Sequence, residues 1–124
     1  PEQMAEDARQ AVKRGYDCLK IKVGVNPALD VERLTAVRQA AGADVSIRID
    51  ANQAWTPKQA VSILNQMQEK GLGIEFAEQP VKAADLEGLK IRNGSRGYSD
   101  FGRRERIFTS GRGKKSCRCG RRIW

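Results

Sequence analysis

Two lysines and two carboxylates occur at regular spacing in the first two thirds of the chain. Lys20 and Lys22 flank Ile21, Asp50 follows Lys22 by 28 residues, and Glu78 follows Asp50 by a further 28 residues. Each group lies at the end of an apolar run and precedes a segment with helical periodicity, which is the pattern of a repeated βα unit. Because the strands of a (β/α)₈ barrel end at one rim, the spacing predicts that these side chains meet in one site.

These residue types suggest a metal ion and a base. Carboxylate oxygens are the ligands that Mg²⁺ takes from proteins, so Asp50 and Glu78 are candidate metal ligands. Asn52 could support that site or contact a substrate. Lys20 and Lys22 alternate along one strand and share a face about 7 Å apart. Burial and mutual repulsion would lower the pKa of a lysine there, and such a lysine could act as a base.

Each feature also has a purely structural interpretation. Alternate lysines often mark the solvated face of a sheet, Asp50-Ala51-Asn52 could be a turn or a cap, and Glu78-Gln79-Pro80 could end a strand. The equal spacing favours a site, because charges that face inward from three successive strands are costly unless they surround a cation or an anionic substrate.

The elements that must position these residues alternate along the chain. Periodicity and capping signals predict, in order, a helix over 2–14, a strand over 18–23, a helix over 27–42, a strand over 45–49, a helix over 57–71, a strand over 74–77 and the start of a helix over 85–90. This order predicts parallel strands joined by right-handed crossovers. A closed barrel needs roughly 250 residues, so we expect a partial TIM-type (β/α) barrel of three parallel strands. Its two unpaired sheet edges would invite self-association.

The formal net charge of +8 is concentrated at the C-terminal end. Residues 1–90 hold 12 basic and 13 acidic groups, whereas residues 91–124 hold 11 basic and 2 acidic groups. We therefore expect a barrel domain over 1–90 and a non-matching, poorly ordered basic tail over 91–124. Any tail this basic should bind nucleic acid non-specifically. A dedicated nucleic-acid-binding function remains an alternative that only sequence or structure preference in gel shifts would support.

The sequence lacks the signals of a membrane or secreted protein. No run of about 18 apolar residues could span a bilayer, and the N-terminal residues have neither the basic start nor the apolar core of a signal peptide. These features predict a soluble cytoplasmic protein.

Three motifs together resemble those of a known superfamily. They are Lys20-Ile21-Lys22, Ile49-Asp50-Ala51-Asn52-Gln53-Ala54-Trp55 and Glu78-Gln79-Pro80. They resemble the enolase superfamily in its muconate-lactonizing and mandelate-racemase branch. The segments 15–24 and 71–81 are most similar to the dipeptide epimerases, typified by L-Ala-D/L-Glu epimerase.

The resemblance implies a reaction and a role for each residue. Asp50 and Glu78 would hold Mg²⁺, and Lys22 would move the proton α to a carboxylate or carbonyl group of a dipeptide or another small carboxylate. The metal would stabilise the enolate, and Lys20 would tune Lys22. Another reaction of the superfamily is the alternative: cycloisomerisation, dehydration or o-succinylbenzoate synthesis.

The sequence departs from the family pattern in the tail. The family implies a preceding capping domain, a third carboxylate ligand and a second lysine on the opposite face of the substrate, so the fragment alone is expected to be inactive. The third ligand should fall near residues 103–106, which read Arg-Arg-Glu-Arg. With one choice of codons, residues 102–106 read one nucleotide later give Ala-Asp-Glu-Ser, the kind of motif the family uses there. We hypothesise that the tail is out-of-frame translation that begins between Lys90 and about Tyr98.

Overall fold

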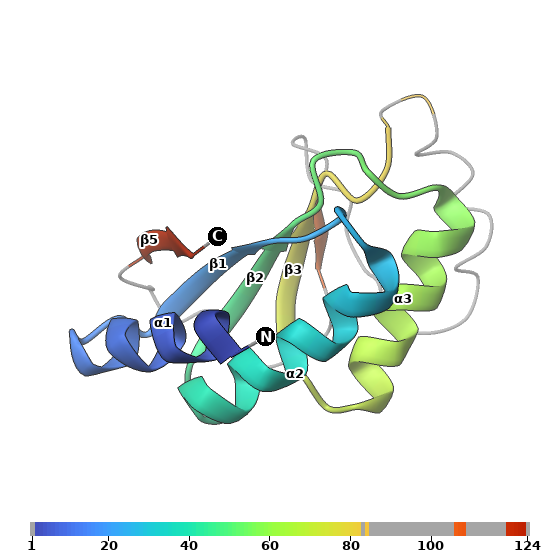
Figure 1. Cartoon of the computed structure of the whole chain (residues 1–124). Coiled ribbons are helices and arrows are strands. Elements are labelled where there is room, and N and C mark those ends of the chain that lie inside the picture. The colour runs from blue at the N-terminus through green and yellow to red at the C-terminus, as the bar shows by residue number, and fades with distance from the viewer. Residues whose placement is uncertain (1, 83, 85–105, 109–118, 124) are drawn as a thin grey trace.

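The computed structural model describes residues 2–82, 84, 106–108 and 119–123. Helices and strands alternate in the order α1 (Glu2–Lys13), β1 (Cys18–Lys22), α2 (Pro27–Ala41), β2 (Ser46–Asp50), α3 (Pro57–Glu69) and β3 (Ile74–Glu78), followed by the short strands β4 (Arg106–Phe108) and β5 (Cys119–Ile123). Helices α1–α3 lie on one side of the sheet formed by β1–β3 (Figure 1). No helix in this described part of the chain is long and apolar enough to cross a membrane.

Local signals fix where the helices begin. Pro27 occupies the first turn of α2 directly after the N-cap residue Asn26. Pro57 occupies the first turn of α3 directly after the N-cap residue Thr56. Thr56 and Gln59 form a capping box, in which the Thr56 hydroxyl accepts a hydrogen bond from the Gln59 backbone N–H and the Gln59 side chain accepts one from the Thr56 backbone N–H. These caps set where the loops after β1 and β2 end, and those loops border the candidate site.

The register of the sheet brings the strand ends to one level. β1 pairs with β2 and β2 with β3, both in parallel. Lys22 is the register partner of Asp50, and Asp50 is the register partner of Glu78. This arrangement confirms the predicted partial α/β barrel of three parallel strands with their helices.

An apolar core lies between the helices and the sheet and contains residues of both. Alternate strand residues, such as Leu19, Ile21, Ile47 and Ile49, are fully buried in the same cluster as Leu34 and other residues of the helices. The intervening residues, among them Lys20, lie on the opposite face of the sheet, as the alternation of side chains along a strand requires.

The C-terminal part of the chain adds two strands that the sequence did not predict. The sheet order is β4-β3-β2-β1-β5, in which β4 runs antiparallel to β3 and β5 runs parallel to β1. Both edges of the three-strand core are therefore paired over part of their length, contrary to the expectation of two exposed edges. The helix expected from residue 85 and most of the basic tail lie outside the described residues.

Arg38 joins the segments that enter β2 and β3, at the end of the sheet away from the candidate site. Its guanidinium donates hydrogen bonds to the carbonyl oxygens of Gly42 (2.8 Å), Val45 (2.6 Å), Leu72 (2.8 Å) and Gly73 (3.2 Å). The cost of desolvating the guanidinium lowers the pKa of Arg38 below its usual range. One side chain thus satisfies four carbonyl groups that belong to two different connections.

We expect Arg38→Gln to lower the free energy of unfolding by about 2 kcal/mol, because the partly buried carbonyls of Val45 and Leu72 lose their donors. Urea denaturation of the two chains measures the difference. Arg9→Gln, which removes an arginine from an exposed pair with Glu6, is the control and should leave the stability nearly unchanged. Equal losses in both variants would contradict this role for Arg38.

Candidate active site

Lys20 bridges the two carboxylates at the ends of β2 and β3. Its Nζ lies 2.9 Å from Asp50 Oδ2 and 2.6 Å from Glu78 Oε2. The side chains are largely shielded from solvent, with exposed fractions of 21% for Lys20, 11% for Asp50 and 28% for Glu78. Asp50 and Glu78, which lie 28 residues apart in the sequence, therefore both contact the ammonium group of Lys20.

The charge state of Lys20 differs from the expectation. Burial alone would lower its pKa, but hydrogen bonds to Glu78 and Asp50 and the charges of the two carboxylates outweigh that effect, so the pKa of Lys20 is raised. For Lys20 the expected lowering of the pKa is wrong, because contact with two acids stabilises the ammonium form more than burial and a neighbouring lysine disfavour it. Lys20 is thus a cation at neutral pH.

Lys22 and Asn52 occupy more open positions at the same end of the sheet. Lys22 ends β1 with an exposed side chain, and it makes no ion pair with any residue that the structure describes. Asn52 is also exposed, and its backbone N–H donates a hydrogen bond to Asp50 Oδ1 at 3.2 Å. Asn52 therefore supports Asp50 through its main chain, while its side chain remains available to a ligand.

Backbone hydrogen bonds extend the register past the ends of the strands. The N–H of Val23 donates to Asp50 O at 3.0 Å, that of Ala51 to Glu78 O at 3.0 Å, and that of Gln53 to Gln79 O at 2.7 Å. Asn52, Gln53 and Gln79 all have positive φ values, between 45° and 62°. Such values are costly for residues other than glycine, and they concentrate in the loops that border the site.

A second charged pair lies one layer below the first. Arg48 Nε lies 2.7 Å from Glu75 Oε2, and the Arg48 guanidinium lies 5.0 Å from the centre of the Phe76 ring. Alternation along β2 places Arg48 on the same face as Asp50, which the sequence indicates. The position of Glu75 could not be predicted, because the register shifts between Ile47 and Arg48 and leaves Glu75 as an extra residue in β3.

The donor set fits a magnesium ion. Mg²⁺ is commonly held by one or two carboxylates while water and substrate complete its coordination. Asp50 and Glu78 each place an oxygen on a common cation, the Lys20 ammonium, so the two residues are close enough to share a metal ion. Within the described ranges no group of three or more potential ligand side chains occurs; a third carboxylate was predicted for residues 103–106, of which the structure describes only Arg106.

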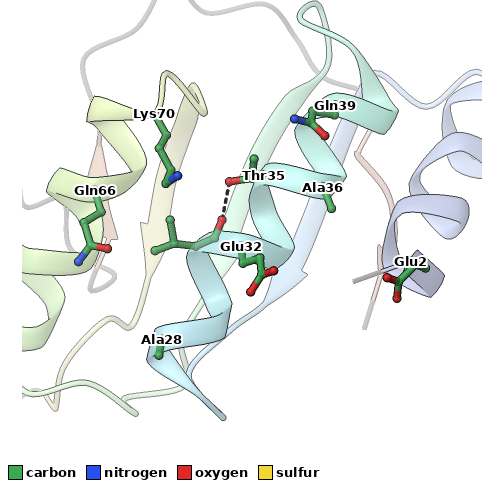
Figure 2. A pocket seen from close by; sticks show the side chains of 9 residues that line it. Glu2, Ala28, Glu32, Thr35, Ala36, Gln39, Gln66 and Lys70 are labelled. Carbon is green, nitrogen blue, oxygen red and sulfur yellow. Dashed lines mark hydrogen bonds between the residues drawn. The ribbon is translucent and has the colours of Figure 1, made fainter.

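A separate hollow of about 490 Å³ lies on the helical side of the molecule. Figure 2 shows Glu32, Thr35 and Gln39 of α2 along its walls, beside Gln66 of α3 and Lys70, the residue that follows α3. None of the predicted site residues lines it, so it is distinct from the cluster around Lys20.

Comparisons with known proteins agree with this architecture. Residues 3–96 match the family described as enolase C-terminal domain-like. The chain is 56% identical over 91 residues to the L-Ala-D/L-Glu epimerase of Clostridium acetobutylicum, a match that covers 73% of this chain and 25% of that enzyme. The chain thus spans about a quarter of the length of this curated relative.

Two solved structures of similar proteins superpose on the chain. The substrate-liganded L-Ala-D/L-Glu epimerase of Bacillus subtilis is 49% identical with a TM-score of 0.69, over 73% of this chain and 25% of that one. The dipeptide epimerase of Enterococcus faecalis in complex with Mg and the dipeptide L-Leu-L-Tyr is 51% identical with a TM-score of 0.66, over 71% and 24%. This chain belongs to the enolase C-terminal domain-like family, in the branch that contains the dipeptide epimerases.

Proposed function

We propose that the chain carries part of the active site of a Mg²⁺-dependent dipeptide epimerase-like enzyme. Asp50 and Glu78 hold the metal, Lys22 is the acid/base, and Asn52 contacts the substrate. The observation that carries this proposal is the convergence of Asp50 and Glu78 on the Lys20 ammonium at the ends of parallel strands. A sealed structural core would not favour three charged groups at this place.

The two lysines have different tasks. Lys20 is protonated between the carboxylates in the metal-free chain, and its positive charge lies beside Lys22. Lys22 is exposed at the end of the neighbouring strand, where its amine, in the neutral form, can take the α proton of a bound dipeptide or other carboxylate. When bound, Mg²⁺ would offset the negative charge that develops on the substrate carboxylate as that proton leaves.

The substrate class follows from the relatives. Several of the similar proteins are dipeptide epimerases, so a dipeptide such as L-Ala-L-Glu is the first substrate to test. Epimerisation needs a second base on the opposite face of the substrate, and the described residues offer no lysine there. We therefore propose that the chain alone does not invert its substrate and that it works in the cytoplasm only as part of a longer enzyme.

Proton exchange tests this proposal directly. Lys22 can remove the α proton, exchange it with solvent and return a deuteron to the same face, so we expect slow Mg²⁺-dependent exchange of the α protons of L-Ala-L-Glu in D₂O, measured by NMR. Polarimetry should show no inversion at an enzymatic rate, because the second base is missing. The expected rate is well below that of a complete epimerase.

Substitutions identify the base in this exchange. Lys22→Ala should abolish the exchange, whereas Lys13→Ala, which removes a lysine from the exposed end of α1, should not affect it. Exchange that persists in Lys22→Ala, or no Mg²⁺-dependent exchange in the unaltered chain, would refute the role of Lys22. Rapid inversion would refute the proposal that the site is incomplete.

We further propose that the basic tail is not part of the enzyme domain and arises from out-of-frame translation that begins between Lys90 and about Tyr98. The family match ends at residue 96, between Lys90 and Tyr98, where the sequence loses its helical and strand periodicity. The coding DNA decides this point: a second reading frame that restores the family pattern is expected, and codons incompatible with Ala-Asp-Glu-Ser at 102–106 would exclude it.

A further inference from the structure

Asp30 is a buried carboxyl group outside the cluster around Lys20. It lies in the first turn of α2 and is 1% exposed. Its Oδ2 accepts a hydrogen bond from the backbone N–H of Gly24 at 2.7 Å. The nearest described cation is Arg33, whose Nη1 lies 3.8 Å from Oδ1, too far for a hydrogen bond. A carboxyl group buried at such cost calls for a specific role.

Gly24 is the point at which the loop after β1 meets the loop after β2. It has a φ of +105°, and a Cβ atom built on it would lie 2.6 Å from Ala54 Cβ and 2.9 Å from Ala51 O. Only glycine permits this approach, both for its φ and for the lack of space. The hydrogen bond to Asp30 therefore fixes the loop that follows Lys22 directly against the loop that follows Asp50.

The second loop reaches the same carboxyl group through Trp55. The Trp55 side chain is 2% exposed and stabilises the ionised form of Asp30. Trp55 Nε1 and Asp30 Oδ1 are both buried, and neither has a hydrogen bond of ordinary geometry within the described part of the chain. Because the Trp55 side chain acts on Asp30, the two side chains lie close together, and each keeps one buried polar atom without a hydrogen bond among the described residues.

Trp55 also links this contact to the third loop. Its backbone N–H donates to Pro80 O at 3.2 Å, two residues beyond Glu78. A continuous set of contacts therefore runs from the loop after β1, through Asp30 and Trp55, to the loop after β3.

We propose that Asp30 is a positioning residue of the candidate active site: its carboxylate holds the loops after β1 and β2 together and so sets the spacing between Lys20 and the two metal-binding carboxylates. The inference rests on the proposed function, since the site that Asp30 positions is the proposed metal site. Asp30 itself touches neither metal nor substrate.

The charge of Asp30 is kept at a cost in stability. Burial raises the pKa of Asp30 above its ordinary value of 3.8 and outweighs the opposing effects of the Gly24 N–H, Arg33 and Trp55. A carboxyl group whose pKa is raised on folding makes the folded state less stable at neutral pH than a neutral group would. This loss shrinks as the pH falls through the raised pKa and is gone below the ordinary value of 3.8. A positioning role explains why a carboxyl group is kept at this buried position, since its Oδ2 holds the Gly24 N–H and its side chain lies near Trp55.

Asp30→Asn tests the inference in the full chain. Asparagine has the same size but only one acceptor oxygen, so its NH₂ group must face either the Gly24 N–H or the Trp55 indole N–H. One of the two loops therefore loses its contact with residue 30. Amide resonances of Gln53 and Gln79 are expected to shift in ¹H–¹⁵N NMR spectra. Mg²⁺ affinity, measured by calorimetry, is expected to fall about tenfold, as for the loss of an outer-shell partner of a metal site.

Two further variants separate positioning from general stability. Val37→Ala creates a cavity at a fully buried position of the same helix and should leave the Mg²⁺ affinity of the folded chain unchanged. Trp55→Phe keeps an aromatic side chain but replaces the indole by a phenyl ring without an N–H, and it should shift the Gly24 amide resonance through Asp30 even if Asp30→Asn does not fold. Unchanged resonances at Gln53 and Gln79 in Asp30→Asn, or an unmoved Gly24 resonance in Trp55→Phe, would overturn the inference.

The NMR measurement also distinguishes this inference from the proposed function. If the unaltered chain binds no Mg²⁺ through Asp50 and Glu78, the proposed metal site is wrong. The loop resonances then still decide whether Asp30 aligns the strand ends. If Mg²⁺ binds normally and the affinity is the same in Asp30→Asn, the metal site stands and the positioning role is wrong.

Discussion

Replacing Lys20 with methionine is expected to lower the free energy of unfolding by about 3 kcal/mol in the absence of divalent cations, because two shielded carboxylates lose the cation that they share. Lys22→Met is the matched control, since it makes the same exchange on the same strand at an exposed position, and it should have little effect. Urea denaturation in a buffer with chelator measures both variants. Similar losses in the two would contradict the bridge between Asp50 and Glu78.

The pH dependence of this difference follows from the raised pKa of Lys20. A lysine whose pKa is higher in the folded state than its ordinary value of 10.5 contributes its full stabilisation below pH 10.5 and loses it as the pH rises through the folded-state pKa. The difference in the free energy of unfolding between Lys20→Met and the unaltered chain should therefore be constant from about pH 6 to pH 9 and become smaller at higher pH. Added Mg²⁺ should stabilise Lys20→Met more than the unaltered chain, since the ammonium and the metal ion compete for the same oxygens.

Removal of either carboxylate is expected to weaken Mg²⁺ binding by about 100-fold or more, since loss of a ligand should cost at least as much as loss of an outer-shell partner can. Asp50→Asn and Glu78→Gln keep the side-chain volume and remove the charge. Isothermal titration calorimetry with Mg²⁺ measures the affinity, and circular dichroism verifies that each variant is folded.

Glu32→Gln is the control for these two variants, because Glu32 is exposed on α2, lines the hollow of Figure 2 and takes no part in the cluster around Lys20. The Mg²⁺ affinity of Glu32→Gln should equal that of the unaltered chain. An equal decrease in Glu32→Gln would indicate that Mg²⁺ responds to the net charge of the surface, and the assignment of Asp50 and Glu78 as ligands would be wrong.

The sequence predicted the parallel core and the meeting of Lys20, Asp50 and Glu78 at its strand ends, for identifiable reasons. Strict alternation around Lys20 and Lys22 and the repeat of 28 residues report on strand register, which is a local and periodic property. The capping signals at Asn26 and Thr56 mark the helix starts that the structure has. The family resemblance, carried by the motifs at the strand ends, is confirmed by the match over residues 3–96.

The remaining features depend on contacts between distant parts of the chain. The pKa of Lys20 could not be predicted, because its sign is decided by distances to two acids on other strands. Asp30 looks like an ordinary acidic residue in the first turn of a helix, and its burial follows only from the approach of Gly24 to the next loop. Glu75 becomes a partner of Arg48 through a shift in register that no sequence pattern marks.

Arg38 and the charged cluster lie at opposite ends of the same three strands, and this separation has a consequence for how the domain can change. The guanidinium fixes where β2 and β3 begin, so the alignment of the strands at this end does not depend on the side chains at their far ends. Substitutions among the exposed residues that follow β1 and β2 can then alter the chemistry without loosening the sheet. A scaffold of this kind tolerates new substrates more readily than one in which the same residues both align the strands and react.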